Sequence, residues 1–521
     1  MMTKQLPQIQ RLGGYLKSPV VLLIVVLLWG IGFRLYKAHY TGIISDEAWT
    51  YEDFCKDLRS AVTLYHTTNN HLLNSIFIVL TKKAAGGYEH FIRIPAVLFG
   101  ALFCCALTYI LHKTIHSWAL KVVVLALILM NWFIVDLTYL ARGYAIAMGA
   151  VYVGIAILVR LSSESNEQKK GNWRLVLLLI AVNFTAFGAM LSSLSILVCV
   201  NIAFMIMMLL SAARIDRKAF ISTLIRLSLM VLASAASLFA LYYRVLPNVL
   251  KYGKAFTVEP LGKYLKKVLW RPLIYDDFTR IKSIEPVYNA ALALLVLCAL
   301  ICICGFIFRR RASKKERSPF FAGPEAIVLM LTAGLLLVMF IQSSVLGMSL
   351  GLPRNGVFLL PLALISSGII MDRAGKAISR IKPLFILQQT ACIGALAVLC
   401  YMNLPSPRAV VVRPYDWGKQ SAVGPLVRML TAIDPQQIWR IKLIDPDTDC
   451  LSRPINYYRH FGFKVNQVKT DDYDVLVCLQ HKPDSRFIYF YNQRFADHHC
   501  CVIVNPASFR NKRVFYQMHC E

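Results

Sequence analysis

The sequence has 521 residues, of which 57% are hydrophobic and only 16% are charged, and its mean hydropathy is +0.55. This composition is too apolar for a soluble globular protein and excludes that class. The formal net charge of +29 does not imply a nucleic-acid partner, because most of the basic residues lie beside apolar runs and face anionic lipid head groups. We therefore expect membrane lipids, and no nucleic acid, as partners.

Apolar runs recur along the chain, and eleven of them approach the roughly 20 residues that a helix needs to cross a bilayer. Two runs are weaker, because 119–137 contains Lys121 and 357–371 is short and contains Pro361. No small-residue cleavage site follows the first run, so we predict a signal anchor. The predicted spans are residues 19–36, 94–111, 119–137, 144–159, 175–190, 191–212, 227–243, 288–308, 326–345, 357–371 and 384–402.

The orientation follows from Lys and Arg, which cluster in every second loop. If the N-terminus is cytoplasmic, the inside loops are basic and the short outside loops contain only Arg142 and Arg354. The sequence therefore predicts an N-in, C-out topology. The inside set includes Lys17, Lys113, Lys121, Arg160, Arg174, Arg217, Lys218, Arg309, Arg373 and Lys376.

Three long segments then lie outside: 37–93, 244–287 and the tail 403–521. Short apolar runs alternate with polar stretches in the tail, which favours a small α/β domain. We predict a polytopic α-helical membrane domain over 1–402 and an extracytoplasmic α/β domain over 403–521. The tail has an odd number of cysteines at no metal-ligand spacing, and we favour reduced, buried thiols over one or two disulfides. These cysteines are Cys450, Cys478, Cys500, Cys501 and Cys520.

The densest cluster of reactive side chains follows the first span, where Asp46 and Glu47 are followed by Ala48 and Trp49. A carboxylate here could act as a general base, or bind a divalent cation that bridges to a phosphate. The alternative is structural, because Ser45 is a good N-cap and acidic residues suit the first turn of a helix. Further along, Asn70 and His71 could bind sugar hydroxyls, or Asn70 could simply cap the next helix.

Arg142 and Arg354 are cations on the predicted outer side, where the topology rule does not place them. A guanidinium is a bidentate phosphate ligand, so both are candidates for binding an anionic substrate. The alternatives are snorkelling to lipid phosphate or, for Arg142, pairing with Asp136. Ionisable groups at membrane depth favour the functional interpretation.

The order of these motifs resembles the GT-C glycosyltransferase superfamily, in particular its bacterial mannosyl-, galacturonosyl- and aminoarabinosyltransferase-like branch. The matching stretches are Asp46-Glu47-Ala48-Trp49, Asn70-His71-Leu72-Leu73, Glu89 through Gly100 around Arg93-Ile94-Pro95, Arg142-Gly143-Tyr144-Ala145-Ile146, and Arg354-Asn355-Gly356 through Pro361. The match is continuous from about Ser45 to Arg160. In the last stretch Asn355 stands where the family has Tyr.

The resemblance implies an inverting glycosyltransferase with a polyprenyl-phosphate-linked sugar as donor. It implies Asp46, or alternatively Glu47, as catalytic base, and Arg142, Arg354 and Tyr144 at the donor phosphate. Trp49, Asn70 and His71 would contact sugar or acceptor, which would be a lipid, glycan or protein of the cell envelope. No resident metal site is predicted, although a divalent metal is an open alternative.

Two other functions remain open at this stage. A transporter or flippase of an anionic lipid-linked sugar would use the same arginines, but it predicts inverted repeats and broken helices. A sensor built on the tail would need fewer membrane spans. The only Asn-x-Ser/Thr sequence, at Asn183, lies inside a predicted helix. The long predicted outside tail thus has no usable glycosylation sequence, which favours a multi-pass protein of the bacterial inner membrane.

Overall fold

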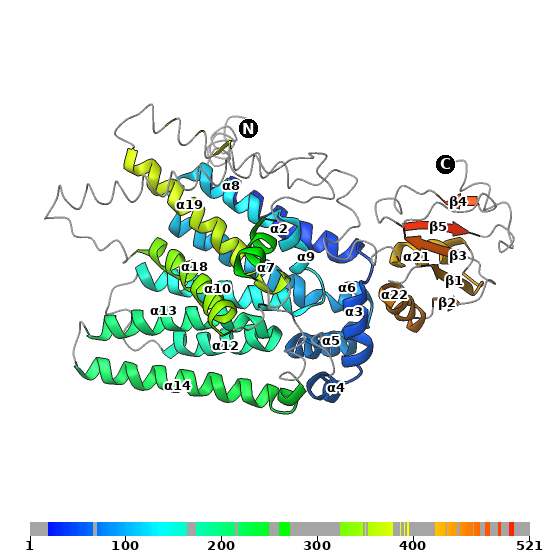
Figure 1. The fold of residues 1–521 in the computed structure, drawn as a ribbon, viewed down its shortest axis with the longest axis horizontal. Helices are drawn as coiled ribbons and strands as arrows, with labels where there is room; N and C mark the ends of the chain where they lie inside the picture. The colour runs from blue at the N-terminus through cyan, green and yellow to red at the C-terminus, as the bar shows by residue number, and fades with distance from the viewer. Residues whose placement is uncertain are drawn as a thin grey trace, which may run out of the picture. The chain divides into compact units, whose positions relative to one another are not determined.

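The structure is a computed structural model (Figure 1). It describes residues 19–65, 70–163, 173–213, 217–248, 260–270, 323–346, 350, 353–378, 386, 390, 393–394, 423–433, 435–444, 449–461, 463–468, 475–479, 488–490 and 500–504. The chain forms two compact units. The first comprises Met1–Arg34, Ala96–Thr138 and Gly143–Leu404, and the second comprises Leu35–Pro95, Tyr139–Arg142 and Pro405–Glu521.

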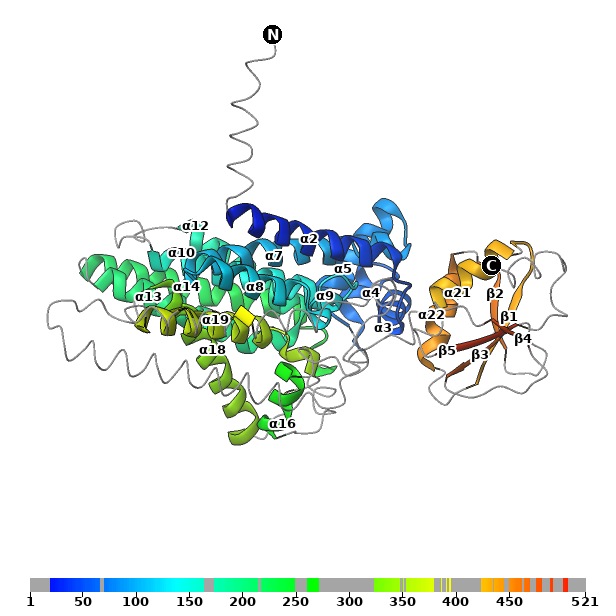
Figure 2. The same cartoon turned by 90° about the horizontal axis from the view of Figure 1, so that it is seen from above.

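The first unit is built from apolar helices. α10 packs against α12, α13 and α18, α14 packs against α12 and α13, and α19 packs against α8 and α18 (Figure 1, Figure 2). The helices are α2 (Pro19–Tyr40), α7 (Ile94–Thr114), α8 (Trp118–Leu129), α9 (Trp132–Leu137), α10 (Gly143–Ser163), α12 (Trp173–Ala189), α13 (Leu194–Ala213), α14 (Arg217–Tyr242), α16 (Leu261–Leu265), α18 (Pro324–Phe340) and α19 (Leu359–Ile378). Short helical turns accompany them: η2 (Leu191–Ser193), η3 (Lys266–Trp270), η4 (Ile341–Val345) and η5 (Pro353–Gly356).

Six described helices are long and apolar enough to cross a membrane, so the chain is a polytopic helical membrane protein. Two shorter apolar helices, Trp118–Leu129 and Trp173–Ala189, accompany them. The count of eleven spans and the N-in, C-out orientation stay predictions. Of the predicted spans, 288–308 lies outside the described residues and 384–402 lies almost wholly outside them. The six are Val20–Tyr40, Ile94–Thr114, Gly143–Ser163, Leu191–Ala213, Phe220–Tyr242 and Pro324–Val345.

The two weaker runs differ from the prediction in instructive ways. The run 119–137 is divided into α8 and α9, because Asn131 caps the second helix by accepting a hydrogen bond from the Ile134 amide at 3.2 Å. The run 357–371 is a longer helix, α19, that continues to Ile378. Pro361 is the third residue of α19, where the first helical turn tolerates a proline.

In the second unit, the segment after α2 folds into five short helices. They are α3 (Ser45–Trp49), the π-helical turn η1 (Thr50–Phe54), α4 (Leu58–Thr63), α5 (Leu72–Ala85) and α6 (Glu89–Ile92). α5 ends at Gly86, whose φ of +89° favours glycine. A Cβ on Gly87 would lie 2.2 Å from the Tyr51 hydroxyl, so only glycine lets the chain pass Tyr51 at this turn.

The tail contributes two helices and a mixed sheet to the same unit. The helices are α21 (Val423–Ile433) and α22 (Asp449–His460). The sheet has the order β2-β1-β3-β5-β4, in which β1 pairs parallel with β2 and β3, whereas β5 pairs antiparallel with β3 and β4 (Figure 1). The strands are β1 (Trp439–Ile444), β2 (Val465–Val468), β3 (Val475–Leu479), β4 (Ile488–Phe490) and β5 (Cys500–Val504). The tail therefore has α/β structure.

One hydrophobic core joins the segment after α2 to the tail. α22 packs on α3 and on β2, and α21 packs on α22. Fully burying one large apolar side chain contributes about 1.5–3 kcal/mol, so this shared core couples the two segments strongly. From the first segment it contains Ile43, Ala48, Tyr51, Phe54, Cys55, Ala61, Ile78, Val79 and Ile92, and from the tail Leu426, Val427, Leu430, Trp439, Ile441, Ile455, Tyr457, Tyr458 and Val465.

Candidate functional site

Glu47 lies at the centre of a buried hydrogen-bond network. Its side chain and that of Arg93 are both 0% exposed and form a bidentate ion pair through Arg93 Nε (2.8 Å) and Nη2. The carboxylate also accepts hydrogen bonds from the amides of Ile44 (3.2 Å) and Ala141 (2.6 Å). Four donors thus converge on Glu47, as a buried carboxylate requires.

Arg93 uses its remaining donors on the end of α2. It donates to the carbonyls of Ala38 (3.1 Å), Thr41 (2.6 Å) and Gly42 (3.0 Å). Burial opposes the charge of the guanidinium, but the Glu47 carboxylate outweighs it and the pKa of Arg93 lies above its ordinary value. Glu47 and Arg93 therefore fasten α3 to the end of α2 as an intact ion pair.

The short segment Tyr139–Arg142 is held against α3 and α5. The Ala141 amide donates to Glu47, and the Ala141 carbonyl accepts from Asn74 Nδ2 at 3.0 Å. The Tyr139 hydroxyl donates to Thr41 Oγ1 at 3.4 Å. These contacts fix the backbone that carries Arg142, so a residue distant in sequence is brought beside the carboxylate of Asp46.

Asp46 and Arg142 form the more accessible part of the site. Arg142 Nη2 lies 3.6 Å from Asp46 Oδ2, and the Asp46 side chain is 18% exposed whereas that of Arg142 is 1% exposed. Arg142 Nη1 donates to the Asp46 carbonyl (3.2 Å) and to Thr50 Oγ1 (3.3 Å). Arg142 is thus positioned by the first turns of α3 and η1, and the Asp46 side chain is partly exposed although its Oδ2, the oxygen nearest Arg142, is buried.

Trp49 connects this site to the tail. The guanidinium of Arg453 on α22 stacks over the Trp49 ring at 4.2 Å, and Arg453 Nη1 lies 3.9 Å from Glu52 and 3.6 Å from Asp53. Burial raises the pKa of Glu52 and the Arg453 charge lowers it in part. Trp49 Nε1 is buried and has no hydrogen-bond partner among the described residues. A single tail residue therefore contacts three side chains of the α3–η1 segment.

A second tail contact holds α6. The Glu89 carboxylate accepts from Arg428 Nη1 (2.7 Å) and from the Tyr458 hydroxyl (3.2 Å), and that hydroxyl accepts from the Ile43 amide. Burial raises the pKa of Tyr458, which keeps its hydroxyl a neutral donor. The Tyr457 hydroxyl donates to the Gly87 carbonyl. The tail thus fixes both ends of the segment that contains Asp46.

The side chain of Asn70 forms hydrogen bonds with neighbouring residues of the protein. Its amide donates to the carbonyls of Ala61 (3.3 Å) and Leu64 (2.6 Å), and its oxygen accepts from the Ser75 hydroxyl at 2.7 Å. His71 takes the N-cap position of α5 with no capping hydrogen bond from its side chain. Asn70 therefore closes the connection between α4 and α5.

Tyr144 and Arg354 belong to the first unit. Tyr144 is 2% exposed and is the second residue of α10. Arg354 is half-buried on η5, which packs against η3, and the Tyr264 hydroxyl next to this contact donates to the Leu350 carbonyl at 3.3 Å. Among the described side chains, no group of three or more His, Cys, Asp or Glu is arranged to hold a metal ion.

The sequence analysis did not assign a role to three residues that position the site: Arg93, Asn74 and Arg453. Arg93 carried the same signal as Arg142 and Arg354, because it is an arginine at the predicted outer end of a span, and its placement inside a motif hid it. Asn74 and Arg453 carried no local signal, since their partners lie 67 residues away and in a different part of the chain.

No family model matches the chain, and no curated protein matches it. Two crystal structures of ArnT from Cupriavidus metallidurans, one bound to undecaprenyl phosphate and one in the apo state, are similar to it. Both have a TM-score of 0.49 and 13% sequence identity over 94% of this chain, covering 99% and 98% of the ArnT chain respectively. Similarity at this level carries no weight for a shared activity, so the function is inferred from the residues of this chain.

Proposed function

We propose that the chain is a glycosyltransferase of the bacterial inner membrane, with Asp46 as general base. It would transfer a sugar from a polyprenyl-phosphate donor to a cell-envelope acceptor on the outer face, with inversion. The observation that carries the proposal is the division of labour between two adjacent carboxylates. Glu47 is saturated by four donors, whereas Asp46 is at the edge of solvent beside a positioned arginine.

The proposed reaction is a single displacement. Asp46 takes the proton of the acceptor hydroxyl while that oxygen attacks the anomeric carbon of the sugar. The bond between the anomeric carbon and the phosphate oxygen breaks, and polyprenyl phosphate leaves with the bonding electrons. Attack from the face opposite the phosphate gives inversion. Glu47 takes no proton in this scheme, because its role is to hold α3 and the Tyr139–Arg142 segment.

The arginines would bind the donor phosphate and stabilise the charge that grows on it as the bond breaks. Arg142 lies 3.6 Å from Asp46, so a phosphate bound by this guanidinium would hold the donor beside the proposed base. Arg354 and Tyr144 are proposed as further donor ligands from the first unit.

The acceptor side of the proposal rests on Trp49 and His71. Trp49 presents an aromatic ring of the kind that packs on sugars, and its buried Nε1 is a hydrogen-bond donor. Asn70 is proposed to act indirectly, because its amide holds the turn that presents His71. A divalent cation between Asp46 and a donor phosphate is the alternative role for this carboxylate.

The test is a transfer assay with purified full-length protein and a panel of polyprenyl-phosphate sugars. We expect transfer of labelled sugar, and release of polyprenyl phosphate, for one class of donor. Arg354→Ala should weaken donor binding by about 2 kcal/mol, roughly 30-fold, the usual cost of removing one side of a desolvated charge pair. Arg354→Lys should recover only part of this, because an ammonium lacks the fork of a guanidinium.

A lipid-linked-sugar transporter would give a different result in the same preparation. In proteoliposomes it would move donor between leaflets without breaking the sugar–phosphate bond. Movement of intact donor, together with no release of polyprenyl phosphate for any donor in the panel, would replace the glycosyltransferase proposal. Addition and chelation of divalent cations in the transfer assay test the alternative role of Asp46.

A further inference from the structure

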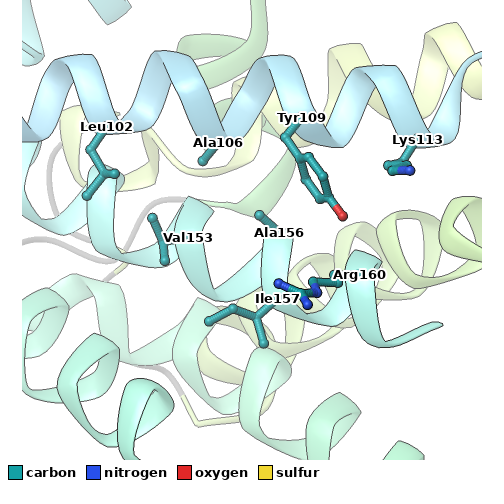
Figure 3. Close-up of a pocket in the computed structure, with 8 residues that line it drawn as sticks. All are labelled: Leu102, Ala106, Tyr109, Lys113, Val153, Ala156, Ile157 and Arg160. Carbon is teal, nitrogen blue, oxygen red and sulfur yellow. The ribbon is translucent and has the colours of Figure 1, made fainter. Parts of the chain in front are cut away.

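A groove between α7 and α10 lies within the first unit, and none of its lining residues belongs to the site described above (Figure 3). Its volume is about 480 Å³, within the roughly 300–1,000 Å³ range of small-molecule sites. One part of its wall is apolar, and the other end carries Tyr109, Lys113 and Arg160 (Figure 3). The apolar lining residues are Leu102, Ala106, Val153, Ala156 and Ile157.

The groove forms because α7 and α10 are in close contact in their N-terminal halves, whereas further along both helices the facing side chains are small and leave space between them. A Cβ on Gly149 would lie 2.6 Å from the Phe99 carbonyl, so the backbones are in close contact there. Phe103 and Tyr152 then pack edge to face at 4.9 Å. One turn further along, Ala106 and Ala156 face the same space without filling it (Figure 3). The cavity thus begins where small residues replace the packed aromatic pair.

The polar end of the groove gathers positive charge. Lys113 lies in the last turn of α7 and Arg160 in the last turn of α10. Lys113 Nζ is 5.9 Å from the centre of the Tyr109 ring, and the Tyr109 side chain points into the groove toward Arg160 (Figure 3). A phosphate bound at this end of the groove would interact favourably with both side chains.

We propose that this groove binds one anionic phospholipid, with its phosphate at Lys113 and Arg160 and an acyl chain along the apolar wall. Both flanking helices are candidate membrane spans, so lipid acyl chains would surround the groove in the bilayer. Leu102, at the apolar end, is 42% exposed, which opens the groove toward lipid. A guanidinium supplies bidentate bonds to phosphate, and the tyrosine hydroxyl can add a donor. Neither Arg142 nor Arg354, the proposed donor ligands, lines the groove.

Basic side chains at the ends of membrane helices also reach lipid phosphates by snorkelling, but this non-specific contact does not select one kind of lipid. The experiment therefore measures selectivity. Purified full-length protein is exchanged into nanodiscs that contain phosphatidylglycerol and phosphatidylcholine with the same acyl chains, and the lipid retained after extraction into detergent is counted by native mass spectrometry. We expect one phosphatidylglycerol to be retained at least about 10-fold more often than phosphatidylcholine, since each basic residue near an anionic lipid contributes on the order of 1 kcal/mol.

Two matched pairs of variants locate the binding. Lys113→Gln with Arg160→Gln should abolish the preference, whereas Arg174→Gln with Lys218→Gln removes the same charge from α12 and α14 and should keep it. Ala156→Phe fills the groove and should release the lipid, whereas Ala235→Phe on the exposed side of α14 should not.

Equal retention in the two charge variants, or retention unchanged by Ala156→Phe, overturns the proposal. Two competitors test the identity of the ligand. Displacement by inorganic phosphate alone would reduce the site to a free-phosphate site, and tighter retention of polyprenyl phosphate than of phosphatidylglycerol would assign the groove to that lipid instead. Either outcome overturns the phospholipid assignment.

Discussion

Asp46 and Glu47 are neighbours in the chain, yet the two ion pairs that they form differ in almost every respect. Glu47 pairs bidentately with Arg93 in a place where both side chains are 0% exposed, and two backbone amides complete its coordination. Asp46 pairs with Arg142 at 3.6 Å and keeps 18% of its side chain exposed. The first pair joins α2, α3 and the Tyr139–Arg142 segment, and the second lies beside it with only the Asp46 side chain partly exposed.

This difference is the reason why we propose a structural role for Glu47 and a catalytic role for Asp46. The Glu47 carboxylate accepts from four donors in a place where its side chain is fully buried, which suits a structural role. The Asp46 side chain is partly exposed and lies 3.6 Å from Arg142, which fits the proposed role of a general base. We therefore propose different roles for these adjacent positions, whose side chains point in different directions on one short helix.

The largest effect is expected for Asp46→Asn, which keeps the size and an oxygen acceptor but removes the basicity. We expect turnover in the transfer assay to fall by roughly 10²–10⁴-fold if Asp46 is the general base. Folding should be nearly normal, because Arg142 keeps its bonds to the Asp46 carbonyl and to Thr50. Near-normal turnover in this variant would remove Asp46 from the chemistry. Asp53→Asn, on η1, is the matched control and should keep its activity.

Glu47→Gln should act on folding. It leaves the buried Arg93 without a countercharge, and breaking a buried pair in this way costs about 3–5 kcal/mol. We expect poor expression and a strongly lowered thermal midpoint, measured by fluorescence in detergent. The double change Glu47→Gln with Arg93→Gln should recover part of the loss, because no unpaired charge then remains buried. A stable, inactive Glu47→Gln protein would contradict this division and move the base to Glu47.

A smaller effect is expected for Arg453→Gln, which removes the stacking on Trp49 and the ion pairs to Glu52 and Asp53. Cation–π and partly exposed ion pairs each contribute about 0.5–1 kcal/mol. We expect the KM for acceptor to rise several-fold while donor binding stays unchanged, because Trp49 is proposed on the acceptor side. Arg459→Gln, an exposed change on the same helix, is the control. Loss of donor binding in Arg453→Gln would show that the tail acts on the donor side as well.

The smallest effect is expected at Glu52, whose pKa is raised mainly by burial. A carboxyl whose pKa is higher in the folded than in the unfolded protein binds more protons when folded, so its ionisation weakens folding as the pH rises through the folded pKa. Glu52→Gln should therefore stabilise the protein at pH 7, by at most about 1 kcal/mol, and should have no effect near pH 4. Thermal midpoints of the two proteins at both pH values test this. A loss of stability at pH 7 would mean that the pair with Arg453 outweighs burial.

The membrane helices could be predicted from sequence because their signal is local. Every predicted span within the described residues corresponds to helix, and the tail is α/β as expected from its alternating runs. The division of 119–137 at Asn131 could not be predicted, since one N-cap residue inside an apolar run is a weak signal against many apolar neighbours. Likewise, Pro361 looked like an interruption until the start of α19 at Leu359 placed it in a first turn.

The sequence predicted which residues were candidates for the site, but not the role of each one. Asp46, Glu47 and Arg142 were all selected from their residue types and predicted depth, and the structure brings these three together. Their separate tasks depend on which side chain meets Arg93, a contact across 46 residues of sequence. Asn70 was selected for its polarity, but its amide is used to close a turn. Local patterns identify polar groups at the right depth, and only packing decides which of them are occupied.

The core shared by the segment after α2 and the tail has a consequence for biogenesis. Two hydrogen bonds between these segments join residues 369 and 415 positions apart, from the Tyr458 hydroxyl to Glu89 and from the Ile43 amide to Tyr458. At a synthesis rate of about 5–20 residues per second, the ribosome needs roughly 20–80 s to make the intervening chain. During that time the first segment must wait with its apolar side uncovered, within reach of chaperones and proteases. A chain truncated before α21 would lack the residues that bind Ile43, Gly87 and Glu89, so the segment that contains Asp46 acquires its full set of contacts only when the tail has been made.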